Sequence, residues 1–207
     1  MTRQRRTLMA GALLALVALA GCAGSPTTER YTLPSPANGA ASGVVTSSDM
    51  ATMADYSLVI DQVSVAGYLD EPGIVLQPDA IRLRQASNHQ WAEALGQQLS
   101  RGLRQRLATE LPDTHILMGG NPPEAMHLRV YVEQFQGHYE GVGMASGYWQ
   151  LRGAKGDLLL ERGFSASTPL AEDGYPALVR ALGASWDKVA AGFAAQIRRL
   201  RAAGAGD

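Results

Sequence analysis

Cys22 is the only cysteine of the 207-residue chain, and the residues around it limit how the rest of the protein can be stabilised. Three arginines within residues 1–6 precede an unbroken apolar run over residues 8–19. The small residues Ala20 and Gly21 follow, as a signal peptidase requires. Leu-Ala-Gly-Cys over residues 19–22 is a bacterial lipobox, so residues 1–21 are predicted to be a lipoprotein signal peptide. The predicted lipidation site is Cys22.

Lipidation would anchor the chain through its new N-terminus. The thiol becomes a thioether to a diacylglycerol, and the freed α-amino group can carry a third acyl chain. An uncleaved transmembrane helix is disfavoured because the apolar run is short of the roughly 20 residues that span a bilayer. A twin-arginine signal at Arg5 and Arg6 would change the export route but not the anchor. Residue 23 is Ala and not Asp, and similarity to Gram-negative lipoproteins then implies sorting to the outer membrane, facing the periplasm.

The mature chain must be held together by a hydrophobic core. With its one cysteine on lipid, it has no disulfide and no thiolate metal site. Loss of the three signal-peptide arginines leaves 15 basic against 19 acidic residues, a net charge of about −4. The sequence shows no basic stripe that could follow a phosphate backbone, so nucleic acid is not an expected partner.

The composition divides the mature chain into two parts. Residues 22–55 are interpreted as the lipidated cysteine and a flexible tether, because Ala, Gly, Ser, Thr and Pro dominate and large aliphatic residues are scarce. Residues 30–34 (Arg-Tyr-Thr-Leu-Pro) interrupt the tether, and two readings stay open: a docked edge strand or part of the coil. Residues 56–203 are predicted to form one domain.

The domain is expected to be α+β, with two helices packed on a mostly antiparallel (mixed) sheet. A capping-box pattern at residues 87–90 predicts a first helix that presents Trp91 and the leucines 95, 99, 103 and 107 on one face and ends at Leu111. The last helix is expected to begin near Pro176, and its apolar stripe favours packing on the sheet over a coiled-coil seam. Strands are predicted over residues 56–65, 74–77, 81–84, 115–118, 126–136, 147–152 and 158–167.

Alternation within residues 126–136 predicts which side chains of this strand face the core. Leu128, Val130 and Val132 fall on one side, and Phe135 falls on the other. A hairpin turn is expected at residues 153–157 (Gly-Ala-Lys-Gly-Asp).

No motif predicts catalysis, a metal site or a cofactor. The four histidines (89, 115, 127 and 138) lack metal-ligand spacing, with His89 expected in the first turn of the helix and His127 on the polar face of a strand. The glycines between residues 137 and 147 do not lie between a strand and a helix, which excludes a phosphate-binding loop. The sequence has no G-x-S-x-G or S-x-x-K motif, so the chain is not expected to be an enzyme.

Two segments carry a family resemblance. Residues 65–75 (Val-Ala-Gly-Tyr-Leu-Asp-Glu-Pro-Gly-Ile-Val) and 90–95 (Gln-Trp-Ala-Glu-Ala-Leu), with the lipobox and the 30–34 island ahead of them, resemble the PqiC family of auxiliary lipoproteins of ABC-type transporters. The resemblance implies an outer-membrane docking subunit that works with an MCE-domain (PqiB-like) protein in lipid transport between membranes, as a possible homo-oligomer.

The family supplies no catalytic residues, and only Cys22 carries over, as the lipidated residue. Tyr68, Leu69 and Asp70 are a candidate partner contact, although a structural turn explains the same residues. Two alternatives stay open: a structural lipoprotein that assists another outer-membrane assembly, and an envelope hydrolase.

Overall fold

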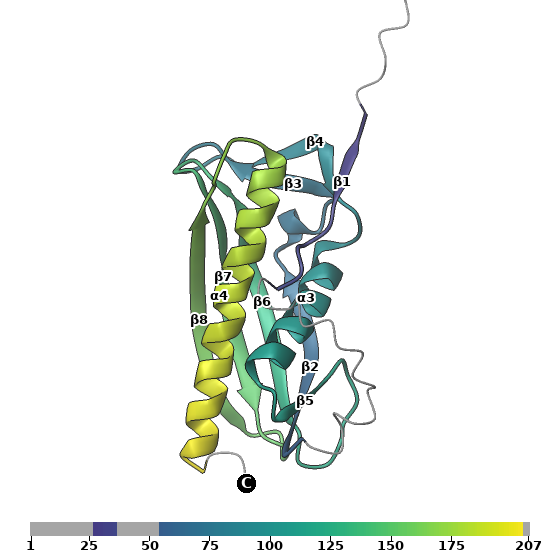
Figure 1. Ribbon diagram of the computed structural model, residues 1–207, viewed down its shortest axis with the longest axis vertical. Helices are drawn as coiled ribbons and strands as arrows, with labels where there is room; N and C mark the ends of the chain where they lie inside the picture. The colour runs from purple at the N-terminus through teal and green to yellow at the C-terminus, as the bar shows by residue number, and fades with distance from the viewer. Residues whose placement is uncertain (1–26, 37–53, 205–207) are drawn as a thin grey trace, which may run out of the picture.

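The computed structural model describes residues 27–36 and 54–204. In this part of the chain, helices α3 (Leu95–Glu110) and α4 (Tyr175–Ala202) cover one face of an eight-stranded mixed sheet, as Figure 1 shows. The predicted α+β class with two helices on a mixed sheet is therefore confirmed. The strands are β1 (Glu29–Tyr31), β2 (Tyr56–Val65), β3 (Gly73–Gln77), β4 (Arg84–Trp91), β5 (Thr114–Leu117), β6 (Met126–His138), β7 (Val142–Arg152) and β8 (Leu158–Pro169), and η1 (Gly67–Leu69) is a short 3-10 helix.

Strand β6 organises the sheet because it is the longest strand and has three partners. One edge pairs with β7 in an antiparallel hairpin, and β7 pairs in turn with β8. The other edge is shared: β2 runs parallel to the first half of β6 as far as Val65 opposite Val132, and β3 runs parallel to its end, with Gln77 opposite His138. Strands β2 and β3 therefore follow one another along the same edge, and the chain leaves that edge only for η1.

The predicted start of the first helix was wrong. Residues 84–91 form β4, which pairs antiparallel with β3 and parallel with β1, and the helix begins only at Leu95. The side-chain amide of Gln90 donates to the carbonyl oxygen of Ser87, so no capping box forms. Pairing on both edges of the segment outweighs the local capping signal. The strand expected at residues 81–84 is therefore found at residues 84–91. The four leucines spaced four residues apart are buried on one face of α3, as predicted.

The expected orientation of Phe135 was also wrong. The alternation holds through Val132, but the β6–β7 register shifts between Val132 and Gln134. This irregularity turns Phe135 into the core, where its side chain is fully buried and its ring meets Trp186 edge-on at 6.1 Å. The shift lies opposite Gly147, where a Cβ atom would come within 2.0 Å of the Tyr131 carbonyl oxygen, so only glycine fits.

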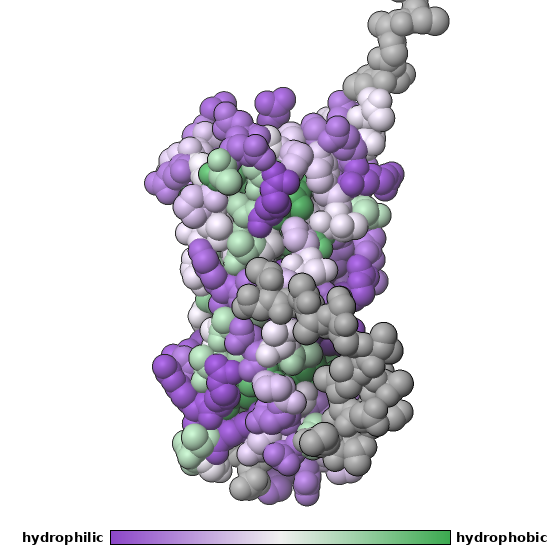
Figure 2. Space-filling model, viewed as in Figure 1, coloured by the Kyte–Doolittle hydropathy of each residue, from purple (hydrophilic) through white to green (hydrophobic). Residues whose placement is uncertain are grey.

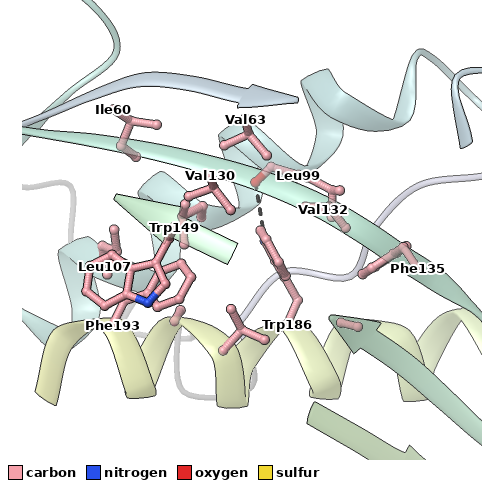
Figure 3. Packing of buried hydrophobic residues seen from close by; sticks show 14 of the residues in the cluster. Ile60, Val63, Leu99, Leu107, Val130, Val132, Phe135, Trp149, Trp186 and Phe193 are labelled. Atoms are coloured by element: carbon pink, nitrogen blue, oxygen red, sulfur yellow. Dashed lines mark hydrogen bonds between the residues drawn. The ribbon is translucent and has the colours of Figure 1, made fainter. Parts of the chain in front are cut away.

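The core lies between the helices and the sheet, and Figure 3 shows its centre. Phe193 of α4 stacks on Trp149 of β7 with ring centroids 4.4 Å apart. The indole N–H of Trp186 donates to the carbonyl oxygen of Leu99, 3.3 Å away, and thereby joins α4 to α3. The apolar stripe of α4 is buried except for the half-buried Leu200. The prediction that this helix packs on the sheet is thus confirmed.

We expect Phe135→Ala to lower the free energy of unfolding by about 3–5 kcal/mol, because it removes a fully buried ring and leaves a cavity. Tyr148→Ala, on the neighbouring strand at a position 42% exposed, is the control and should cost about 1 kcal/mol or less. Urea unfolding of the two variants measures the difference. Equal costs would show that Phe135 does not lie in the core.

Candidate anchoring and docking sites

Residues 29–36, here called the N-terminal segment, pack on the domain although they lie inside the range interpreted as a tether. Strand β1 pairs parallel with the end of β4, Tyr31 opposite Trp91, and the Tyr31 carbonyl oxygen accepts a hydrogen bond from Ala92 at 2.8 Å. The Leu33 amide then donates to Oε1 of Gln98 on α3 at 2.7 Å. Figure 1 shows the segment descending beside α3 and α4. Of the two readings of residues 30–34, the edge strand is the one observed.

Arg106 of α3 joins the N-terminal segment to both helices. Its side chain is 2% exposed; Nη2 donates to the Pro34 carbonyl oxygen at 2.9 Å, and Nε donates to Oδ1 of Asp187 on α4 at 2.6 Å. Further bonds run to the carbonyl oxygens of Gly102 and Gly183. Burial lowers the pKa of the Arg106 guanidinium, and the Asp187 carboxylate opposes that shift. A buried arginine needs this full set of acceptors, and one of them comes from the N-terminal segment.

Two helical glycines make room for the segment. A Cβ atom at Gly102 would lie 2.7 Å from Cδ2 of Leu33, and one at Gly183 would lie 3.1 Å from Cδ and Cγ of Pro34. Glycine inside a helix costs about 1 kcal/mol relative to alanine. The close approach of the N-terminal segment explains both positions, which no helix pattern in the sequence predicts.

The candidate contact at residues 68–70 lies in the excursion between β2 and β3. There the chain leaves the edge of β6, and the amide of Ala66 makes a last backbone bond to Val132. The Tyr68 hydroxyl lies 2.7 Å from two acceptors on β6, the carbonyl oxygen of Glu133 and Oε1 of Gln136. Its side chain thus takes the place of a neighbouring strand at this stretch of β6.

The Tyr68 hydroxyl keeps its proton at neutral pH. Burial raises its pKa to about 12, and the charge of Glu133 adds to the shift. The side-chain amide of Gln136 also donates to Oε1 of Gln77, and the side-chain amide of Gln85 donates to the Tyr68 carbonyl oxygen. This small polar network fixes the shape of the excursion.

The three candidate contact residues have different surroundings. Leu69 is 1% exposed and belongs to the core, whereas Asp70 and its neighbour Glu71 are exposed. Tyr68 is half-buried, with its hydroxyl bonded as described. A role of this segment in partner contact stays a prediction. Tyr68 and Asp70 are the two of the three residues that a partner could reach at the surface. Cys22 and the predicted signal peptide lie outside the described residues.

Three of the four histidines of the described segments, His89, His127 and His138, make side-chain contacts, and His115 is exposed. His89 was wrongly expected in a helix: it lies in β4, stacked on Tyr175 at 3.9 Å. His127 points from the polar side of β6, as predicted, with Nδ1 2.8 Å from Oδ1 of Asp61. Within residues 27–36 and 54–204, no three His, Cys, Asp or Glu side chains are grouped to hold a metal ion. Among the helices of that same part of the chain, none is both long and apolar enough to cross a membrane.

Comparison with known proteins identifies the family. The sequence model for ABC-type transport auxiliary lipoprotein components matches residues 31–194, from β1 to α4. The chain belongs to this family. It is 32% identical over 188 residues to the intermembrane transport lipoprotein PqiC of Escherichia coli (strain K12), covering 90% of this chain and 96% of the relative. The PqiC of Shigella flexneri matches with the same identity and coverage.

Solved structures show the same fold. The crystal structure of an uncharacterized protein aligns with a TM-score of 0.70 at 29% identity, covering 83% of this chain and 99% of that one. A Xanthomonas campestris protein aligns with a TM-score of 0.58 at 16% identity, covering 81% of this chain and 90% of its own. Since the family match begins at Tyr31, residues 31–36 of the N-terminal segment belong to the family's shared domain.

Two alanine substitutions in α4 test how closely the N-terminal segment packs. Gly192→Ala should raise the free energy of unfolding by about 0.5–1 kcal/mol, because alanine favours the helix and nothing lies within 4 Å of the new Cβ atom. Gly183→Ala should lack this gain, because its Cβ atom presses on Pro34. Hydrogen exchange at the Leu33 amide should also become faster in Gly183→Ala only.

Urea unfolding and amide exchange measure the two effects. Equal stabilisation by both substitutions, with unchanged protection at Leu33, would show that the N-terminal segment does not lie against Gly183.

Proposed function

We propose that this family member is an outer-membrane-anchored, periplasm-facing lipoprotein subunit of an MCE/ABC-type intermembrane lipid transport system that supports membrane integrity. It acts by docking and assembly and not by catalysis. Its partner is an MCE-domain (PqiB-like) protein, and a homo-oligomer is the further assembly that the family resemblance implies. The name of the curated relatives, intermembrane transport lipoprotein, supports this class of function.

The observation that carries the proposal is the docking of the N-terminal segment. Only residues 23–28 separate the lipidation site from β1, whereas the sequence alone allowed a tether of more than thirty residues. Seven residue steps from Cys22 to Glu29 span at most about 25 Å, even when fully extended. The lipid anchor would therefore hold the folded domain against the membrane, as a docking subunit requires.

The surface around η1 suits contact with a protein partner. Asp70 and Glu71 are exposed beside it, while the bonds of Tyr68 to β6 fix the backbone that presents them. A rigid surface loses little conformational entropy on binding. The alternatives have other requirements: an envelope hydrolase needs a nucleophile beside a general base, and a structural lipoprotein of another assembly needs a different partner.

The anchor is tested in cells by two substitutions at the lipobox. Cys22→Ser should abolish lipidation and leave the protein out of the outer-membrane fraction. Ala23→Asp should keep the lipid but retain the protein at the inner membrane, and Ala23→Ser is the matched control with normal sorting. Cys22→Ser and Ala23→Asp should each raise envelope permeability as much as deletion of the gene does, and Ala23→Ser should not. Normal permeability in Cys22→Ser, at equal protein abundance, would contradict the proposed function.

The partner is tested by photo-crosslinking from the surface near η1. A photoreactive amino acid in place of Asp70 should form an adduct with the MCE-domain protein, and the same amino acid in place of Lys155 in the β7–β8 turn is the control. Mass spectrometry identifies the adducts. An adduct at residue 70 with a second copy of this chain would assign the surface to self-association, and no adduct with an MCE-domain protein from either position would contradict the partnership.

A further inference from the structure

The loop between β3 and β4, residues 78–83, presents apolar side chains to solvent. Ile81 is 91% exposed and Leu83 47% exposed. The loop is nevertheless ordered by Asp79, whose Oδ1 accepts hydrogen bonds from the amides of Ile81 at 3.1 Å and Arg82 at 2.9 Å. The other carboxylate oxygen of Asp79 pairs with the Arg82 side chain. The backbone is therefore shaped so that Ile81 projects outward.

A third apolar side chain lies at the same end of the sheet. Gln77, the last residue of β3, pairs with His138, the last residue of β6, so the loop that follows β3 and the turn that follows β6 are neighbours. Tyr139 in that turn is 53% exposed. Ile81, Leu83 and Tyr139 are here called the apolar tip. Figure 2 shows apolar side chains among polar ones at this upper end of the molecule.

The chain enters the fold from the same end. Because β1 runs parallel to β4 with Glu29 opposite His89, the direction that precedes Glu29 points along β4 toward Arg84 and the β3–β4 loop. Figure 1 shows β1 beginning at the upper end, beside β4. Five residue steps separate Cys22 from Thr27, the first described residue, and they span at most about 18 Å.

The opposite end of the domain is out of reach of the anchor. Strand β6 has 13 residues, about 40 Å at a strand's rise, and its first residue lies at the end that carries the β7–β8 turn. Met118 and Leu158 are also exposed there, but a chain of five residues from Thr27 cannot bring a lipid to them. Of the large apolar side chains of the described residues that are exposed at the two ends, only those of the apolar tip lie at the end from which the chain enters.

We propose that the apolar tip is a membrane-contact site, inserted into the lipid surface to which Cys22 is attached. The inference rests on the proposed lipid anchor and adds a second, non-covalent contact to it. Ile81 reaches the boundary between head groups and acyl chains, and Tyr139 takes the interfacial position that an amphipathic ring prefers. Arg82 and Arg84 flank Leu83 and can keep their charges at the level of the head groups.

Insertion of the tip would set the orientation of the whole domain. The anchor alone limits the distance from the membrane but leaves the domain free to tilt. A second contact at the end of β3 and β6 would direct the β7–β8 turn and the C-terminal end of α4 away from the membrane. A protein partner or a second copy of the chain are the other possible occupants of the tip, and the experiment below separates them from lipid.

The test uses the full-length, lipidated protein with one thiol added. A lipidated Cys22 has no free thiol, so Ile81→Cys carries the only site for a fluorescent label, and Lys155→Cys in the exposed β7–β8 turn is the matched control. The labelled proteins are reconstituted in phosphatidylethanolamine/phosphatidylglycerol vesicles, with either a nitroxide-bearing lipid or aqueous iodide as the quencher. We expect the lipid-borne quencher to act several-fold more strongly at residue 81 than at residue 155, and iodide to act in the reverse order.

The other outcomes separate a failure of the proposed membrane contact from a failure of the proposed lipid anchor. Equal access of iodide to both labels on vesicle-bound protein would overturn the membrane contact but leave the anchor intact. A label at residue 81 that is shielded from both quenchers would also overturn it, because protein would then cover the tip. Failure of the protein to bind vesicles, or labelling of the wild-type chain at Cys22, would instead contradict the lipid anchor on which the proposed function depends.

Discussion

The length of β6 is the constraint on which the rest of the sheet depends. Strand β2 pairs with the first part of its second edge and β3 with the end, so β2 and β3 share that edge. The chain leaves β6 between these two strands, so the stretch of β6 from Glu133 to Gln136 has no neighbouring strand on this edge. The register shift against β7 falls at the same place. Tyr68 supplies the missing hydrogen-bond partner from one side, and Phe135 fills the core on the other.

This arrangement gives a physical reason for the family-like segment at residues 65–75. Ala66 ends the pairing with β6, Tyr68 covers the gap, and Leu69 enters the core. Pro72 then accepts a hydrogen bond from Trp91 through its carbonyl oxygen, and Gly73 begins β3 so close to Ala86 that a Cβ atom would lie 2.6 Å from its carbonyl oxygen. The segment that carries the resemblance is therefore largely a corner of the sheet, and its exposed acidic residues are what remains for contact.

The accuracy of sequence-based prediction followed the range of the interactions involved. Strand β2 and the leucine face of α3 were predicted well because each pattern is local and buries one face. The start of α3 was wrong because β4 is held by pairing with β3, the strand before it, and with β1, which lies far away in the sequence. Phe135 was misplaced because a register shift has no signal in alternation alone. The role of Arg106 was missed because its acceptors lie on α4 and on the N-terminal segment, both far from it in the sequence.

The N-terminal segment connects the packing of the domain to the position of the anchor. Its carbonyl oxygen at Pro34 completes the hydrogen bonds of a buried arginine, and its side chains fill the space that Gly102 and Gly183 leave open. Removing the segment would leave a buried charge short of an acceptor, so the segment is stabilised by the same interactions that join α3 to α4. A pull on the proposed lipid anchor would consequently be transmitted to the helix pair and to the edge of the sheet. With the apolar tip as a second contact, a domain fixed in this way would have few orientations available at a membrane surface, which would reduce the entropy that a partner must overcome on docking.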